Sequence, residues 1–131
     1  LKALSPGIAI WAAEPETAAP LALSLEKGSP QRFEAWKASF VDGAGGQSVF
    51  PRMWERMRPV VDGAIVVTLE ETRQAMRLLA EKSRVIAEGA GALSVAAALT
   101  GKAGPGPIVA IVSGGNIDLA KFCELIGASA S

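Results

Sequence analysis

The sequence contains no histidine, no tyrosine and a single cysteine among its 131 residues. Without histidine, the chain lacks the commonest metal ligand of proteins and the usual general base of serine and cysteine hydrolases. The lone Cys123 excludes an internal disulfide framework and suits a reducing cytoplasm, and we interpret it as a small apolar residue on a helix. Any chemistry must therefore depend on lysines, carboxylates, hydroxyls, backbone groups or a bound cofactor.

Net charge and long apolar runs are also missing. The 13 basic and 13 acidic residues cancel, so no positive field would attract a phosphate backbone. The longest apolar runs fall far short of the roughly 20 residues that span a bilayer, and the first residues do not have the pattern of a secretory signal. We therefore expect a cytoplasmic protein with neither a nucleic acid nor a membrane as a partner.

Half of the residues are hydrophobic and 20% are charged, which predicts one folded domain. Apolar stretches rich in β-branched residues predict three buried strands, and the segments between them predict helices. Continuous apolar strands that alternate with helices favour a three-layer α/β/α arrangement with a mostly parallel sheet. The predicted strands are 7–13, 63–68 and 108–113, and the predicted helices lie within 14–28, 48–61, 68–81, 88–101 and 118–127.

Several helix boundaries are marked by their residues. Thr68 and Glu71 match a capping box, Pro51 suits the first turn of a helix, and Gly28 and Gly127 are typical of helix C-termini. The first four residues, LKAL, have the character of a helix end with no strand before it. We therefore expect residues 1–131 to be the C-terminal part of a larger domain.

A serine, two glycines and an asparagine follow the third apolar stretch. In an open parallel sheet, ligands bind beyond the carboxyl ends of the strands, and glycines there let a ligand or another backbone come into contact. Ser113 and Asn116 could each donate or accept a hydrogen bond. The same residues also suit a plain strand-to-helix turn, and this stretch alone does not decide between the two interpretations.

Three further stretches have two interpretations each, and read alone each favours the purely structural one. Glu88, in EGAGA, could hold a polar group of a cofactor or favour the positive end of the following helix. Gly43, in VDGAGG, could leave a flat surface for an aromatic ring or form a turn with Asp42. Glu14 and Glu16, in AEPE, could favour a helix dipole or bind a hard cation.

The whole sequence resembles the C-terminal portion of the pyridoxal-phosphate-dependent threonine/serine dehydratase and serine racemase family. EGAGA followed by SGGNID at this spacing is specific, and the combined match is stronger than any single motif. The family has the fold type II architecture, in which two α/β domains hold the cofactor between them. The stretches that carry the resemblance are, in order, EPETAAPLALSLEKG, ASFVDG, PVVDGAIVVTLEE, VIAEGAGALSVAAALTGK and IVSGGNIDL.

The resemblance implies a role for each matching residue. The hydroxyl of Ser113 would lie against the pyridine nitrogen of the cofactor, and Gly43 would lie against one face of the ring. Glu88 would sit near the ring in a polar network, while Gly114 and Asn116 would shape the floor of the pocket. A neutral hydroxyl does not favour a protonated pyridine nitrogen, which weakens the ring as an electron sink and suits elimination of a β-hydroxyl.

The sequence also departs from the family. The Schiff-base lysine and the glycine-rich loop that binds the cofactor phosphate belong to upstream motifs that do not occur here. At the family's metal site, Glu14 and the carbonyl of Ala18 match, but Pro20 replaces the aspartate, so no metal is expected. The lysines that are present are all interpreted as surface residues: Lys2, Lys27, Lys37, Lys82, Lys102 and Lys121.

These features predict a fragment of a lyase that converts L-threonine or L-serine to a 2-oxo acid and ammonia. The fragment is expected to be inactive alone, because the lysine and the phosphate loop are absent. The alternatives are a serine racemase and a stand-alone α/β module that binds a small molecule or a partner chain without catalysis. The resemblance further implies a small amino acid as the substrate and a homo-oligomer, either a dimer or a tetramer.

Overall fold

A computed structural model describes residues 1–127 of the chain. Strands β1 (Trp11–Pro15) and β2 (Gly63–Val67) form a parallel pair in which Trp11 is opposite Gly63 and Pro15 is opposite Val67. None of the helices in this part of the chain has the length and apolar character needed to cross a membrane. In chain order, the helical elements are α1 (Pro20–Lys27), the 3-10 turn η1 (Asp42–Ala44), α2 (Pro51–Met57), α3 (Leu69–Leu78), the π-helical turn η2 (Leu79–Ser83), α4 (Gly89–Leu99) and α5 (Leu119–Gly127).

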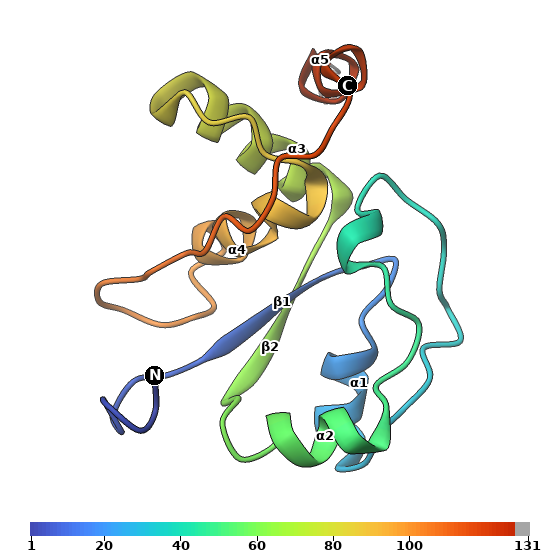
Figure 1. Cartoon of the computed structure of the whole chain (residues 1–131), viewed down its shortest axis with the longest axis vertical. Helices are drawn as coiled ribbons and strands as arrows, with labels where there is room; N and C mark the ends of the chain where they lie inside the picture. Colours follow the sequence, from blue (N-terminus) through green and yellow to red (C-terminus); the bar gives the residue numbers. More distant parts are fainter. Residues whose placement is uncertain (128–131) are drawn as a thin grey trace.

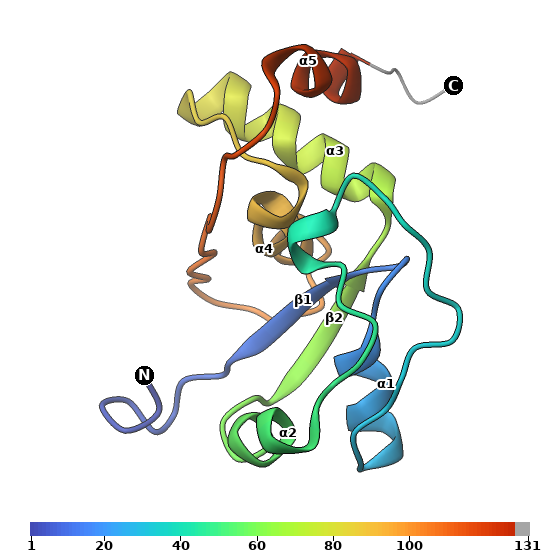
Figure 2. The ribbon, with the colours of Figure 1, turned by 45° about the vertical axis from the view of Figure 1, so that its right-hand side comes forward.

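Helices cover both faces of the two-stranded sheet (Figure 1). Helix α1 packs against the strands on one side and α4 packs against them on the other, which Figure 2 shows most clearly. Helix α3 lies on α4, and α5 lies against α3 at the far end of the molecule. The predicted three-layer arrangement with a parallel sheet is confirmed.

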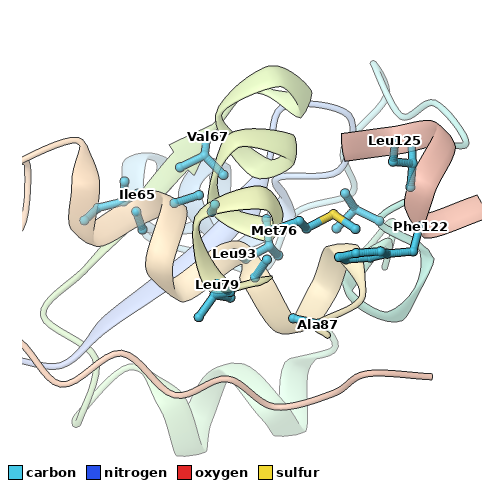
Figure 3. Packing of buried hydrophobic residues seen from close by; sticks show 13 residues of the cluster. Ile65, Val67, Met76, Leu79, Ala87, Leu93, Phe122 and Leu125 are labelled. Atoms are coloured by element: carbon cyan, nitrogen blue, oxygen red, sulfur yellow. The ribbon is translucent and has the colours of Figure 1, made fainter. Parts of the chain in front are cut away.

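The main core lies between β2 and the helices α3, α4 and α5 (Figure 3). Val67 from β2, Met76 from α3 and Leu93 from α4 are all buried there. Phe122 and Leu125 from α5 complete the cluster. Burying a side chain of this size stabilises the fold by about 1.5–3 kcal/mol, so these two residues hold α5 on the rest of the molecule.

The predicted helix boundaries are confirmed at three places. The Thr68 hydroxyl accepts the N–H of Glu71 at 3.1 Å, and the Glu71 carboxylate accepts the N–H of Thr68 at 2.7 Å. Gly28 follows α1 with a φ of 71°, in the left-handed region that glycine adopts without strain. Pro51 is the first residue of α2.

The prediction of a third buried strand at 108–113 is wrong for this chain. The segment is extended, but no backbone ladder joins it to β1 or β2. Its apolar side chains point into solvent, with Val109 88% exposed and Ile111 67% exposed. A strand requires a neighbour with free backbone groups as well as a suitable composition, and residues 1–127 place none beside this segment.

Smaller predictions are wrong as well. The first strand begins at Trp11 rather than at residue 7. By contrast, LKAL forms a single turn, as a helix end would, in which the carbonyl of Leu1 accepts the N–H groups of Leu4 and Ser5. Helix α2 lies within the predicted range, but it buries none of its residues, and Met53 is 48% exposed. Cys123 lies on a helix as predicted, but it is exposed.

We expect Thr68→Ala to destabilise the protein, because it removes the acceptor for the Glu71 N–H at the start of α3. Loss of such a cap costs about 1 kcal/mol, which urea unfolding followed by circular dichroism measures. The control is Ser83→Ala, at an exposed hydroxyl in η2, which should leave the unfolding free energy unchanged. Equal losses in the two variants would contradict the capping role.

Candidate functional site

The two glutamates at the end of β1 each cap a different helix. Both carboxylate oxygens of Glu14 accept backbone N–H groups in the first turn of α1, from Leu21 and Ala22, each at 2.8 Å. A carboxylate oxygen of Glu16 accepts the N–H of Leu69, the first residue of α3, at 2.9 Å. The sequence indicated the interaction with α1, but no local pattern could indicate a contact between residues 53 positions apart.

The structure favours helix capping over metal binding for Glu14. Burial raises the pKa of its carboxyl, and the two N–H groups that it accepts offset this only in part. Ala18, the other weak candidate ligand, is completely buried, and Pro20 is the first residue of α1. Within residues 1–127, no three His, Cys, Asp or Glu side chains are grouped as metal ligands would be.

The N-terminus of α4 is where the predicted cofactor-binding stretches meet. Glu88 is the N-cap residue of α4, and its N–H donates to the carbonyl of Gly114 at 3.1 Å. A Cβ on Gly91 would overlap that same carbonyl oxygen, and a Cβ on Gly114 would overlap the Glu88 carboxylate. The glycines of EGAGA and SGGN therefore let two stretches of backbone come into direct contact.

The turn η1 brings Gly43 to the same end of α4. Gly43 is exposed, and a Cβ at this position would come within 3.0 Å of the Cβ of Ala90. The turn is fixed by Asp42, whose carboxylate accepts the N–H of Gly43 at 2.8 Å. Trp36 also anchors it, since the indole N–H donates to the carbonyl of Gly45 at 2.8 Å. Two hydrogen bonds thus fix the turn, and Gly43 stays exposed.

Ser113 and Asn116 flank the two glycines of SGGN, and both side chains are exposed. Neither side chain forms a hydrogen bond with another residue of 1–127. Of the predicted site residues, the structure brings Gly43, Glu88 and Gly114 together at the N-terminus of α4. Ser113 directly precedes Gly114 in the chain, while Asn116 lies further toward α5.

One contact beside this cluster was missed by the sequence analysis. The guanidinium carbon of Arg73, on α3, lies 5.1 Å from the centroid of the Phe40 ring. Phe40 in turn contacts Gly89 at the start of α4, where an added Cβ would approach the ring to 2.9 Å. A cation over an aromatic ring from a distant segment leaves no periodic signal, so only the folded chain reveals it.

No lysine belongs to this cluster. Lys2 pairs with Asp62 at 2.7 Å, Lys27 with Glu26 at 3.3 Å and Lys121 with Glu124 at 3.0 Å. The other three, Lys37, Lys82 and Lys102, have exposed side chains. Residues 1–127 therefore supply carboxylate, hydroxyl and backbone groups at the N-terminus of α4, without an amine.

One protein family and several known enzymes are similar to this chain. The family described as pyridoxal-phosphate dependent enzyme matches residues 1–114. The L-threonine ammonia-lyase of Thermotoga maritima is 35% identical over 127 residues, which are 96% of this chain and 31% of that protein. The catabolic L-threonine dehydratase TdcB of Escherichia coli is 30% identical over 131 residues, covering 97% of this chain and 40% of that protein.

Solved structures of the same kind superpose closely. A threonine deaminase from T.th. has a TM-score of 0.84 and 37% sequence identity, covering 90% of this chain and 40% of that one. Maize serine racemase has a TM-score of 0.82 and 32% identity, covering 94% of this chain and 40% of that one. This chain thus spans well under half of the length of each relative.

We expect Glu14→Gln to change how stability depends on pH. Because burial raises the pKa of the Glu14 carboxyl, its contribution to stability is fully present below the ordinary pKa of a glutamate and is lost as the pH rises through the raised value. Urea unfolding between about pH 4 and pH 7 should show the parent protein losing stability relative to the variant. Glu26→Gln, at an exposed glutamate of α1, is the control, and a pH-independent difference for Glu14→Gln would contradict the prediction.

Gly91→Ala should destabilise the protein, although alanine normally stabilises a helix interior relative to glycine by about 1 kcal/mol. The added Cβ would overlap the carbonyl oxygen of Gly114, so residues 113–115 would have to move away, at a cost of about 1–3 kcal/mol. Urea unfolding shows whether the free energy of unfolding falls or rises, and changes in the amide NMR shifts of 113–115 show whether these residues move. Gly46→Ala, where a Cβ meets nothing within 4 Å, is the control; a gain in stability for Gly91→Ala would refute the close fit.

Proposed function

Because the chain belongs to the family of pyridoxal-phosphate-dependent enzymes, we propose that it is the C-terminal portion of the large, cofactor-binding domain of a threonine/serine dehydratase. The complete enzyme would convert L-threonine or L-serine to a 2-oxo acid and ammonia. The relatives support this substrate class, since two of them are an L-threonine ammonia-lyase and an L-threonine dehydratase. The observation that carries the proposal is the meeting of Gly43, Glu88 and Gly114 at the N-terminus of α4.

The residues of this cluster suit a planar aromatic cofactor. Gly43 is exposed, so a ring could lie against its backbone, and the direction that a Cβ would take is occupied by Ala90. Ser113 has an exposed hydroxyl that can pair with a ring nitrogen. Glu88, half-buried beside Gly114, is placed to accept a hydrogen bond from a polar group of the ring. Asn116 and Gly114 would form the floor of the pocket.

Ser113 also sets the electronic character of the site. When bound, pyridoxal phosphate supplies a conjugated ring that withdraws electrons from the amino acid substrate. A hydroxyl is neutral, so Ser113 does not stabilise a positive charge on the ring nitrogen as a carboxylate would. The ring would then withdraw electrons only moderately from the substrate. Moderate withdrawal suits an elimination in which the β-hydroxyl leaves promptly once the α-proton is removed. This chain would thus orient and tune the ring, and the lysine that removes the proton would come from elsewhere in the protein.

The segment 108–112 supports the view that the domain extends beyond this chain. An extended, unpaired backbone can pair with a neighbouring strand, and the apolar side chains of such a strand are buried by the layers that pack on the sheet. We propose that further strands pair with this segment in the complete protein. That remainder would also supply the Schiff-base lysine and the phosphate-binding loop, so that residues 1–131 alone would not catalyse the reaction.

Two other functions remain candidates. Similarity to maize serine racemase, with 32% identity, favours a racemase as the second candidate. Pro20 in place of a metal-binding aspartate, at the first residue of α1, favours the dehydratase instead. The exposed segment 108–112 would also suit a non-catalytic module that associates through it. In each case we propose a homo-oligomer, dimer or tetramer, in the cytoplasm.

The test uses the complete protein loaded with pyridoxal phosphate, with 2-oxo acid release from L-threonine and L-serine as the assay. Ser113→Ala should lower kcat about 3- to 10-fold, the worth of one hydrogen bond, and should shift the absorption band of the bound cofactor. Ser83→Ala, in η2, is the control and should change neither. Conversion of L-serine to D-serine without release of a 2-oxo acid would establish the racemase. If adding pyridoxal phosphate causes no saturable change in absorbance, the non-catalytic binding module is favoured.

A further inference from the structure

The contact between Arg73 and Phe40 joins α3 to the segment that leads into η1. Phe40 is half-buried and packs against the main core, and Val41 after it is completely buried in that core. Gly43, the residue proposed to face the cofactor ring, lies three positions beyond Phe40. Any force that holds Phe40 in place therefore also acts on the position of Gly43.

Phe40 is wedged against the first residue of α4. A Cβ on Gly89 would come within 2.9 Å of both the ring and the carbonyl oxygen of Phe40, and within 3.1 Å of the Val41 side chain. Gly89 directly follows Glu88, the N-cap of α4. The Phe40 ring thus spans from the guanidinium of Arg73 to the helix end that carries Glu88.

Arg73 contacts both a carboxylate of its own helix and the Phe40 ring. Its Nε is buried without a hydrogen-bond partner among residues 1–127, and its one ion pair, with Glu70, is long at 3.4 Å. The Phe40 ring, 5.1 Å from the guanidinium carbon, is the partner of Arg73 from outside α3. Arg77, one turn further along α3, differs because it is exposed and pairs with Glu81 at 3.2 Å.

We infer that Arg73 is a positioning residue for the cofactor site, acting through Phe40 to hold η1 and Gly43 against the N-terminus of α4. This inference rests on the proposed function only for the identity of the ligand. A planar guanidinium can stack on the ring in a way that a lysine ammonium cannot. Without Arg73, the ring loses the partner on its α3 side, and the 40–43 segment is held less tightly against the N-terminus of α4.

The first measurement needs no cofactor. In the complete protein without pyridoxal phosphate, Arg73→Ala should speed hydrogen exchange at the amides of Gly43 and Gly45, with little change in the core amides of α4. Arg77→Ala is the matched control and should leave exchange at both sites unchanged. Uniformly faster exchange across the chain, or equal effects of the two variants, would overturn the inference.

The second measurement is the affinity for pyridoxal phosphate, followed by absorbance. Arg73→Ala should weaken binding about 2- to 10-fold, in keeping with a cation–aromatic contact. The affinity of Arg73→Lys should lie between that of Arg73→Ala and that of the parent protein. Phe40→Leu should have a similar effect, and the double variant should not be additive. Additive losses, or equal affinity of Arg73→Ala and the parent, would overturn the inference.

The two measurements separate the inference from the proposed function. If the parent protein does not bind pyridoxal phosphate, the proposed function fails, and the exchange data still decide whether Arg73 holds η1. If the parent binds the cofactor and Arg73→Ala changes neither exchange nor affinity, only the role of Arg73 is refuted.

Discussion

The direct contact between residues 113–115 and the first turn of α4 is the constraint on which the rest of the site depends. A side chain at Gly91 or Gly114 would overlap the opposite stretch, and one at Gly115 would come within 2.5 Å of the carbonyl oxygen of Ile86. At Gly91 and Gly115 the opposing atoms are backbone, so no change of rotamer could relieve the clash. Helix α4 also packs on both strands and on α3, so the same element that closes the core sets the positions of Glu88 and Ser113.

A second set of constraints acts at the end of β1. The first N–H groups of a helix have no partner within the helix and must find acceptors elsewhere. Glu14 supplies two acceptors to α1, and Glu16 supplies one to α3. Since α3 carries Arg73 and packs on α4, the end of one short strand orients the helices on both faces of the sheet. This explains why two strands suffice to organise the described part of the chain.

Sequence patterns predicted the features that depend on neighbouring residues. The capping box at Thr68, the glycine stop at Gly28 and the helix of small residues at 88–101 are local, and the structure has all three. The resemblance assigned both EGAGA and SGGN to one cofactor site, and in the structure the N–H of Glu88 donates to the carbonyl of Gly114, while their roles toward a cofactor stay predictions. Contacts between distant segments, such as Glu16 with Leu69 and Arg73 with Phe40, could not be predicted, because each depends on the folded arrangement of whole elements.

The segment 108–113 shows how one stretch can be positioned and still lack a strand neighbour. Its composition is that of a buried strand, yet Val109 and Ile111 are exposed. Its position nevertheless follows from contacts inside the chain, since Ser94 donates to the carbonyl of Ile111 at 2.7 Å and Gly114 fits against Gly91. Pairing with a neighbouring strand would therefore increase the burial of this segment more than it would change the position of the segment. On this argument, the backbone around Ser113 is positioned by contacts with α4 that are made within residues 1–127.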